Sequence, residues 1–281
     1  MTAQAALQLF EVNTTQLWDQ GLSACVQLFI ELRDFANINP TFTEIYDEYV
    51  RFSRALEDLA DLASDFVHQA REIRNTLRQL GTQTPVALAQ RNLDRLVRRC
   101  SNMDTESNKL AESFGDVKEG LLKIGEKMNR FLIRENTSIE MTEKVRRLVE
   151  LVANGVEKIS EISGLLAVGS WLGGLLKKKE KALSDNIARR RENHSQAQNL
   201  QSGISTTHTA VADQKTYFLY TSSRLKNLKT ILEDFKLDAG QAAGSWAIQG
   251  QELQIVLDRW RDLAIEMRDV AKMVESHSAR L

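Results

Sequence analysis

The side chains that could carry catalysis or hold a metal are scattered singly along this chain of 281 residues. A zinc site needs histidine or cysteine ligands close together, and a catalytic nucleophile needs a base beside it. The sequence has no C-x-x-C, H-E-x-x-H or G-x-S-x-G motif and no phosphate-cradling G-x-x-x-x-G-K-[ST] loop. We therefore expect no catalytic residue, cofactor, metal site or small-molecule substrate. The four isolated histidines are His68, His194, His208 and His277.

The two cysteines, Cys25 and Cys100, both fall at positions with the spacing of a helix core. Buried free thiols are the simpler interpretation, and a single disulfide stays open as an alternative. The 37 Lys and Arg residues balance 38 Asp and Glu residues, so the whole chain has no net charge that would attract nucleic acid. We expect no nucleic-acid partner.

One apolar stretch, residues 159–176, differs from the rest of the chain. The fifteen residues from Ile162 to Leu176 carry no charge, and four of them are glycines, each costing a helix about 1 kcal/mol relative to alanine. A transmembrane helix needs about 20 apolar residues, so the stretch is short for a permanent span. It is also too apolar for a loop that faces water.

We interpret this stretch as a latent membrane element that packs against protein in water and contacts lipid when a membrane is present. Burying its leucines, valine and tryptophan would supply on the order of 10 kcal/mol before the costs of ordering. The residues expected to contact the membrane are Ile162, Leu165, Leu166, Val168, Trp171, Leu172, Leu175 and Leu176, followed by Lys177, Lys178 and Lys179.

The remainder of the chain predicts long helices, because it contains only two prolines and its apolar residues recur at steps of three and four. Coiled-coil heptads run from Phe52 to Leu80 and from Trp246 to Val274. We expect a helix over 3–37, one from a cap at Thr41 or Thr43 to Leu80, and others over 86–163, 177–237 and from a cap at Ser245 onward. The predicted fold class is all-α, an elongated antiparallel bundle of about five helices with a short mid-chain hydrophobic head.

The third helical segment, 86–163, is the longest. Its first 49 residues alone would form a rod of roughly 70 Å. Asn136-Thr137-Ser138 interrupts the apolar pattern, and Thr137 with Glu140 forms a possible capping box, so we expect a kink or a restart there. Beyond it, the apolar seam is expected to continue into the stretch through Val145, Leu148, Val152, Val156 and Ile159.

The first helix is amphipathic but almost uncharged, with only Glu11 and Asp19 before Glu31. Such a helix can exchange between a protein groove and a membrane interface at low electrostatic cost. Burial in an ordinary bundle is an equally open alternative. The apolar residues of this candidate rearranging or pore-lining helix are Phe10, Leu17, Trp18, Leu22 and Phe29.

This arrangement resembles the cytolysin A type of α-helical pore-forming toxin, including its bacterial multi-component relatives. The resemblance covers the whole chain and rests on architecture, not on a short motif. It implies that 159–179 forms a head that touches a bilayer, that 1–158 and 180–281 form the helical tail, and that 3–37 swings out to line a pore. It also implies assembly into an oligomer with copies of itself or with other toxin components.

The apolar stretch is too short to cross a bilayer twice, which favours one component of a multi-part toxin over a toxin that acts alone. The residues 1–4 lack the basic start of a secretory signal, so we expect secretion by another route and action at a target-cell membrane. The alternative is a cytoplasmic coiled-coil scaffold or membrane-trafficking adaptor that uses 159–176 to bind a partner.

Overall fold

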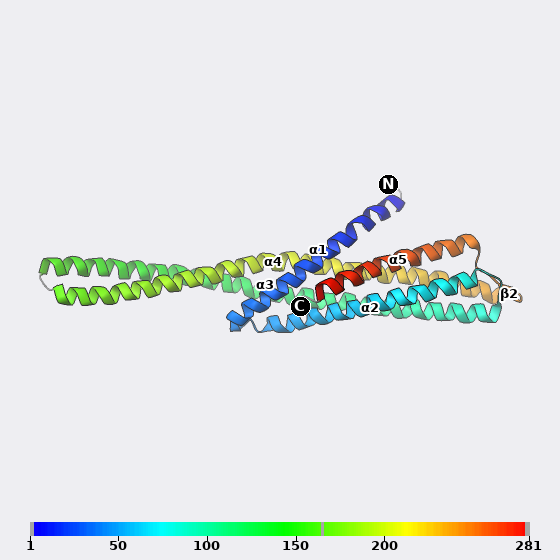
Figure 1. Cartoon of the computed structure of the whole chain (residues 1–281), viewed down its shortest axis with the longest axis horizontal. Helices are drawn as coiled ribbons and strands as arrows, with labels where there is room; N and C mark the ends of the chain where they lie inside the picture. The colour runs from blue at the N-terminus through cyan, green and yellow to red at the C-terminus, as the bar shows by residue number, and fades with distance from the viewer. Residues whose placement is uncertain (1–2, 164–165, 279–281) are drawn as a thin grey trace. The chain divides into compact units, whose positions relative to one another are not determined.

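The computed structural model describes the backbone of residues 3–163 and 166–278, and the side chains of residue 19 and of residues 21–154 and 174–278. Within these ranges the chain forms five α-helices: α1 (Ala3–Ile38), α2 (Glu44–Leu80), α3 (Val86–Ser163), α4 (Leu166–Gln241) and α5 (Gly250–Ser278). The expected all-α antiparallel bundle is therefore confirmed (Figure 1). A 3₁₀ turn, Pro40–Phe42, joins α1 to α2.

The chain divides into two compact units. One is a bundle built from residues 1–122 and 206–281, and the other is a helical hairpin built from residues 123–205. Helices α3 and α4 contribute to both units, and the hairpin consists of the end of α3 and the start of α4.

In the bundle, α5 packs along α2, and α1 contacts both helices (Figure 1). The heptad pattern of α2 explains this packing, because its apolar residues at steps of four and three are all buried: Phe52, Leu56, Leu59, Ala63, Phe66, Ala70, Ile73, Leu77 and Leu80. Trp260 of α5 is fully buried with its ring centroid 6.2 Å from that of Phe66. Phe29 of α1 stacks on Phe52 with 4.5 Å between ring centroids. Contacts between aromatic rings thus join α1, α2 and α5 into one core.

Helices α3 and α4 run antiparallel through the bundle, and side-chain contacts fix their register. The rings of Phe114 and Phe218 stack at 5.9 Å, and Ser222 Oγ donates a hydrogen bond to Asp104 Oδ1 at 2.5 Å. The α4 side of this interface is more polar than the other seams. Its buried polar residues are Thr207, Gln214, Thr221 and Ser222.

Two short strands tie the ends of the bundle helices together. Thr84–Pro85, after α2, pairs antiparallel with Ser245–Trp246, after α4. The prediction that Ser245 caps the last helix is wrong, because its Oγ donates instead to Gln83 Oε1 at 2.6 Å and α5 begins at Gly250. Gly244 allows the tight turn before the strand by adopting a φ of 86°.

The expected restart near Asn136-Thr137-Ser138 is also wrong, since α3 is one helix from Val86 to Ser163. Thr137 does not cap a new helix. Its Oγ1 donates to the Ile133 carbonyl oxygen at 3.0 Å, which satisfies the hydroxyl inside a continuing helix.

Both cysteines are free and fully buried, so the disulfide alternative is excluded. Burial raises the pKa of each thiol to about 12, which keeps Cys25 and Cys100 protonated and unreactive near neutral pH.

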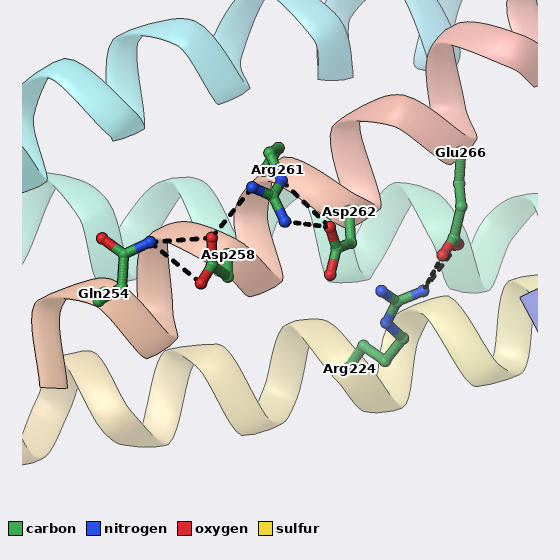
Figure 2. Close-up of polar contacts among 6 residues, drawn as sticks. All are labelled: Arg224, Gln254, Asp258, Arg261, Asp262 and Glu266. Atoms are coloured by element: carbon green, nitrogen blue, oxygen red, sulfur yellow. Dashed lines mark hydrogen bonds and ion pairs between the residues drawn. The ribbon is translucent and has the colours of Figure 1, made fainter. Parts of the chain in front are cut away.

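A charged network between α4 and α5 should contribute to the stability of the bundle (Figure 2). Arg224 Nη1 lies 2.9 Å from Oε1 and 2.7 Å from Oε2 of Glu266, and the Tyr217 hydroxyl donates to the same carboxylate at 3.3 Å. Burial, reinforced by the nearby negative charge of Glu266, raises the pKa of Tyr217. We expect Glu266→Ala to lower the unfolding free energy by about 2–3 kcal/mol, because it leaves a half-buried guanidinium and a buried hydroxyl without this acceptor.

Urea unfolding followed by circular dichroism would measure this loss. Figure 2 also contains the matched control, an exposed cluster on α5 in which Arg261 Nη1 lies 3.3 Å from Asp258 Oδ1. Asp258→Ala should change stability by less than about 1 kcal/mol, because solvent screens that pair. Equal effects of the two substitutions would contradict a structural role for Glu266.

Candidate functional site

The apolar stretch lies where α3 and α4 meet. Helix α3 ends at Ser163 and α4 begins at Leu166, so the described parts of the stretch have a helical backbone despite its glycines. At its end, Leu175 is 47% exposed, Leu176 is half-buried, and the three lysines that follow are exposed. The side chains of the other predicted membrane-contacting residues lie outside the described residues: Ile162, Leu165, Leu166, Val168, Trp171 and Leu172.

Toward this stretch, both apolar side chains and ion pairs join the two helices of the hairpin, and Ile187 of α4 is among the buried residues. Between residues 132 and 154 of α3, only Ile139 and Ala153 are buried. Three ion pairs also join the helices: Glu135 with Arg190, Glu143 with Arg191, and Arg146 with Glu180. In the first of them, Arg190 Nη1 lies 2.9 Å from both carboxylate oxygens of Glu135. Such half-exposed pairs fix the register of two helices more than they stabilise them.

The predicted apolar seam of α3 faces water in this region. Val145, Leu148 and Val152 are 46%, 61% and 54% exposed, so the seam that continues through them is not part of the buried core. The physical reason is that the hairpin has only two helices, and α4 covers the opposite face of α3. Met141 and Leu151 extend the exposed face, which we call the outer seam: Met141, Val145, Leu148, Leu151 and Val152. The side chains of Val156 and Ile159 lie outside the described residues.

Charge is divided unequally between the two units. Residues 123–205 contain 15 Lys and Arg against 10 Asp and Glu, a formal charge of +5, whereas the rest of the chain contains 22 against 28, a charge of −6. Because the two charges nearly cancel, the net charge of the whole chain does not show this difference between the units. Counting charge by segment, as well as over the whole chain, would have revealed it from sequence.

The candidate rearranging helix, α1, is held to the bundle along its C-terminal half. Leu22 and Phe29 are fully buried, whereas the side chains of Phe10, Leu17 and Trp18 lie outside the described residues. A Cβ placed on Gly21 would lie 3.2 Å from the Cβ of Ala210, so the backbones of α1 and α4 approach closely there. His277 Nε2 of α5 lies 2.9 Å from Asp19 Oδ1 of α1, which adds one polar contact.

Across the described ranges, no three His, Cys, Asp or Glu side chains lie close enough to hold a metal ion. None of the helices in those ranges is both long and apolar enough to cross a bilayer. Among the described residues, the hairpin carries the outer seam and leads into the apolar stretch.

Comparison with known proteins gives a structural match only. No protein-family model matches the sequence, and neither does any curated protein. Among solved structures, the SmhB pore of the tripartite α-pore-forming toxin Smh from Serratia marcescens superposes with a TM-score of 0.59 at 12% identity. The match covers 94% of this chain and 100% of that one.

Two components of the tripartite toxin AHL from Aeromonas hydrophila are similar as well. Soluble AhlC matches with a TM-score of 0.55 at 10% identity, over 89% of this chain and 97% of that one. The AhlB pore matches with a TM-score of 0.52 at 12% identity, over 92% of this chain and 99% of that one. The structural resemblance to α-pore-forming toxins expected from the sequence is thus confirmed, and at these identities the likeness concerns the fold alone.

Proposed function

We propose that this chain is one component of a multi-part α-helical pore-forming toxin that changes from a soluble monomer into a membrane-bound oligomer. The observation that carries the proposal is the shared fold over nearly the full length of components of two tripartite toxins. Two of those structures are pores, which supports assembly as part of the activity. In this proposal the chain is secreted and acts at a target-cell membrane.

The head, residues 159–179, is the segment we propose to meet the bilayer first. Its fifteen charge-free residues are too few for two crossings, which supports dependence on partner components. The lysines that follow would remain among the lipid headgroups while the apolar side chains enter the acyl boundary. The glycines would let the backbone change shape at modest cost.

Helix α1 is the segment we propose to rearrange. Only Glu11 and Asp19 carry charge before Glu31, so moving its first half from protein to membrane desolvates few charges. The rearrangement would break the packing of Leu22 and Phe29 in the bundle, which is a large cost. Lipid contact by the head and contacts between protomers would have to offset it.

Release of a trapped dye from liposomes tests the proposal. The purified chain is mixed with vesicles, first alone and then with the products of neighbouring genes, and release is expected in the mixture. Intrinsic tryptophan fluorescence, to which Trp171 contributes, should shift to the blue on lipid binding because the indole leaves water. If the chain causes no dye release and shows no fluorescence shift under any of these conditions, it is not a toxin component.

A further inference from the structure

The outer seam of α3 is an apolar surface that nothing in the described chain covers. Its five side chains are between 46% and 66% exposed. Met141, Val145, Leu148 and Val152 follow steps of four and three, and Leu151 lies three residues after Leu148, so the five share one side of the helix. Contiguous exposed apolar faces on a protein surface often mark interaction sites. The seam is separate from the head, which begins at residue 159.

Charged side chains of both signs flank the seam on α3, among them the exposed Glu140, and the net positive charge of the hairpin comes from residues 177–191 of α4. Lys144 and Arg147 of α3 are exposed and alternate with the apolar residues of the seam. The ion pair between Arg146 and Glu180 sets the register of the two helices, so residues near 180 of α4 lie level with this part of α3. Lysines at 177, 178, 179 and 181 are there, and all four are exposed. The hairpin thus combines an apolar face with a cluster of positive charge.

We propose that this side of the hairpin binds a bilayer that contains anionic lipids and thereby selects the membrane on which the chain acts. This inference rests on the proposed function and adds the lipid class to it. Charge complementarity identifies the occupant, because the hairpin carries +5 and an anionic leaflet carries the opposite sign. A second copy of the chain is a less suitable occupant, because its hairpin also carries +5 and would repel the first hairpin.

The geometry corresponds to a helix that lies in the membrane interface. Leucine, valine and methionine side chains of the seam would enter the boundary between headgroups and acyl chains, while Lys144 and Arg147 would stay among the headgroup phosphates. No span is required, in agreement with the absence of a spanning helix in the described parts of the chain.

Vesicle flotation of the full-length chain tests the charge requirement. Vesicles of phosphatidylcholine are compared with vesicles in which about a third of the lipid is phosphatidylglycerol. Near an anionic surface each Lys or Arg contributes about fivefold to the partition coefficient, so Lys144→Gln with Arg147→Gln should weaken binding to anionic vesicles about 25-fold. Binding to neutral vesicles should not change. High salt should weaken binding of the unmodified chain in the same way.

Arg95→Gln with Arg98→Gln is the matched control. These arginines have the same i, i+3 spacing on the same helix, are equally exposed, and belong to the bundle. Replacing them should leave binding to anionic vesicles within about twofold of that of the unmodified chain. Equal loss in both double variants would mean that only net charge matters and would overturn the assignment to the hairpin.

Leu148→Ser with Leu151→Ser tests the apolar half of the surface. This variant should bind both kinds of vesicle at least tenfold more weakly, because two exposed leucines no longer enter the interface. The control is Leu219→Ser with Leu237→Ser, two leucines of the bundle that are 48% and 65% exposed. If the seam variant binds normally, or if it abolishes an oligomer that forms without lipid, the seam does not serve membrane binding.

The outcomes separate this inference from the proposed function. Dye release could be equal from neutral and anionic vesicles and unchanged in the variant with Lys144→Gln and Arg147→Gln. This result would overturn the proposed lipid selection but would not contradict the toxin function. Hairpin-dependent binding to anionic vesicles without dye release under any condition would support the lipid selection and count against the toxin function.

Discussion

Replacing Leu165, Leu172 and Leu176 by Asp is expected to reduce dye release to the background level while leaving the helical content unchanged. Each leucine that enters an apolar environment contributes about 1.5–3 kcal/mol, so the triple change removes on the order of 5 kcal/mol of membrane affinity. It also adds three carboxylates that must be desolvated. A loss of this size lowers the partition coefficient by more than about 1,000-fold. Dye release and circular dichroism measure the two quantities.

The control for this variant carries the same three added charges on the bundle. Leu88, Leu219 and Leu237 are exposed leucines of that unit, and replacing them by Asp should leave release near that of the unmodified chain. If the head variant still releases dye, residues 159–179 have no part in the mechanism and the proposed head is wrong.

A disulfide between α1 and α4 should block the activity reversibly. A Cβ on Gly21 would lie 3.2 Å from the Cβ of Ala210, and disulfides need about 3.8 Å, so Gly21→Cys with Ala210→Cys requires a shift of only a few tenths of an ångström. If α1 must leave α4 to rearrange, the oxidised protein should release dye at least tenfold more slowly. A reducing agent should restore the rate.

The native thiols do not complicate this experiment, because Cys25 and Cys100 are fully buried and their raised pKa values keep them protonated. The reduced double variant and each single variant serve as controls for the substitutions themselves. An oxidised protein that is as active as its reduced form would show that α1 keeps its contact with α4 in the active state.

The helices of the bundle were predictable because several helices surround each seam. In α2 every heptad position from Phe52 to Leu80 is buried, and in α5 the positions from Val256 to Val274 are buried as well. When a helix is covered by neighbours on one side, the apolar repeat and the buried face are the same set of residues. Chain breakers such as Pro40 and Gly81 then mark the ends correctly, since α1 ends at Ile38 and α2 at Leu80.

The surface of the hairpin was not predictable by the same logic. The pattern through Val145, Leu148 and Val152 is as regular as the one in α2, yet these side chains face solvent. A repeat in sequence shows which residues share a face, but only the number of neighbouring helices decides whether that face is covered. Ion pairs such as the one between Glu135 and Arg190 join residues 55 positions apart, so a pattern of neighbouring residues does not predict them. The predicted membrane contacts of the head remain predictions.

Ion pairs join α3 and α4 along residues 132–154 of α3, where few apolar side chains of α3 are buried. Apolar burial supplies most of the free energy that resists local opening, and between residues 132 and 154 of α3 only two side chains are buried. The bundle, in contrast, buries aromatic rings from α1, α2 and α5 in one core. We therefore expect this part of the hairpin to resist local opening less than the core of the bundle does.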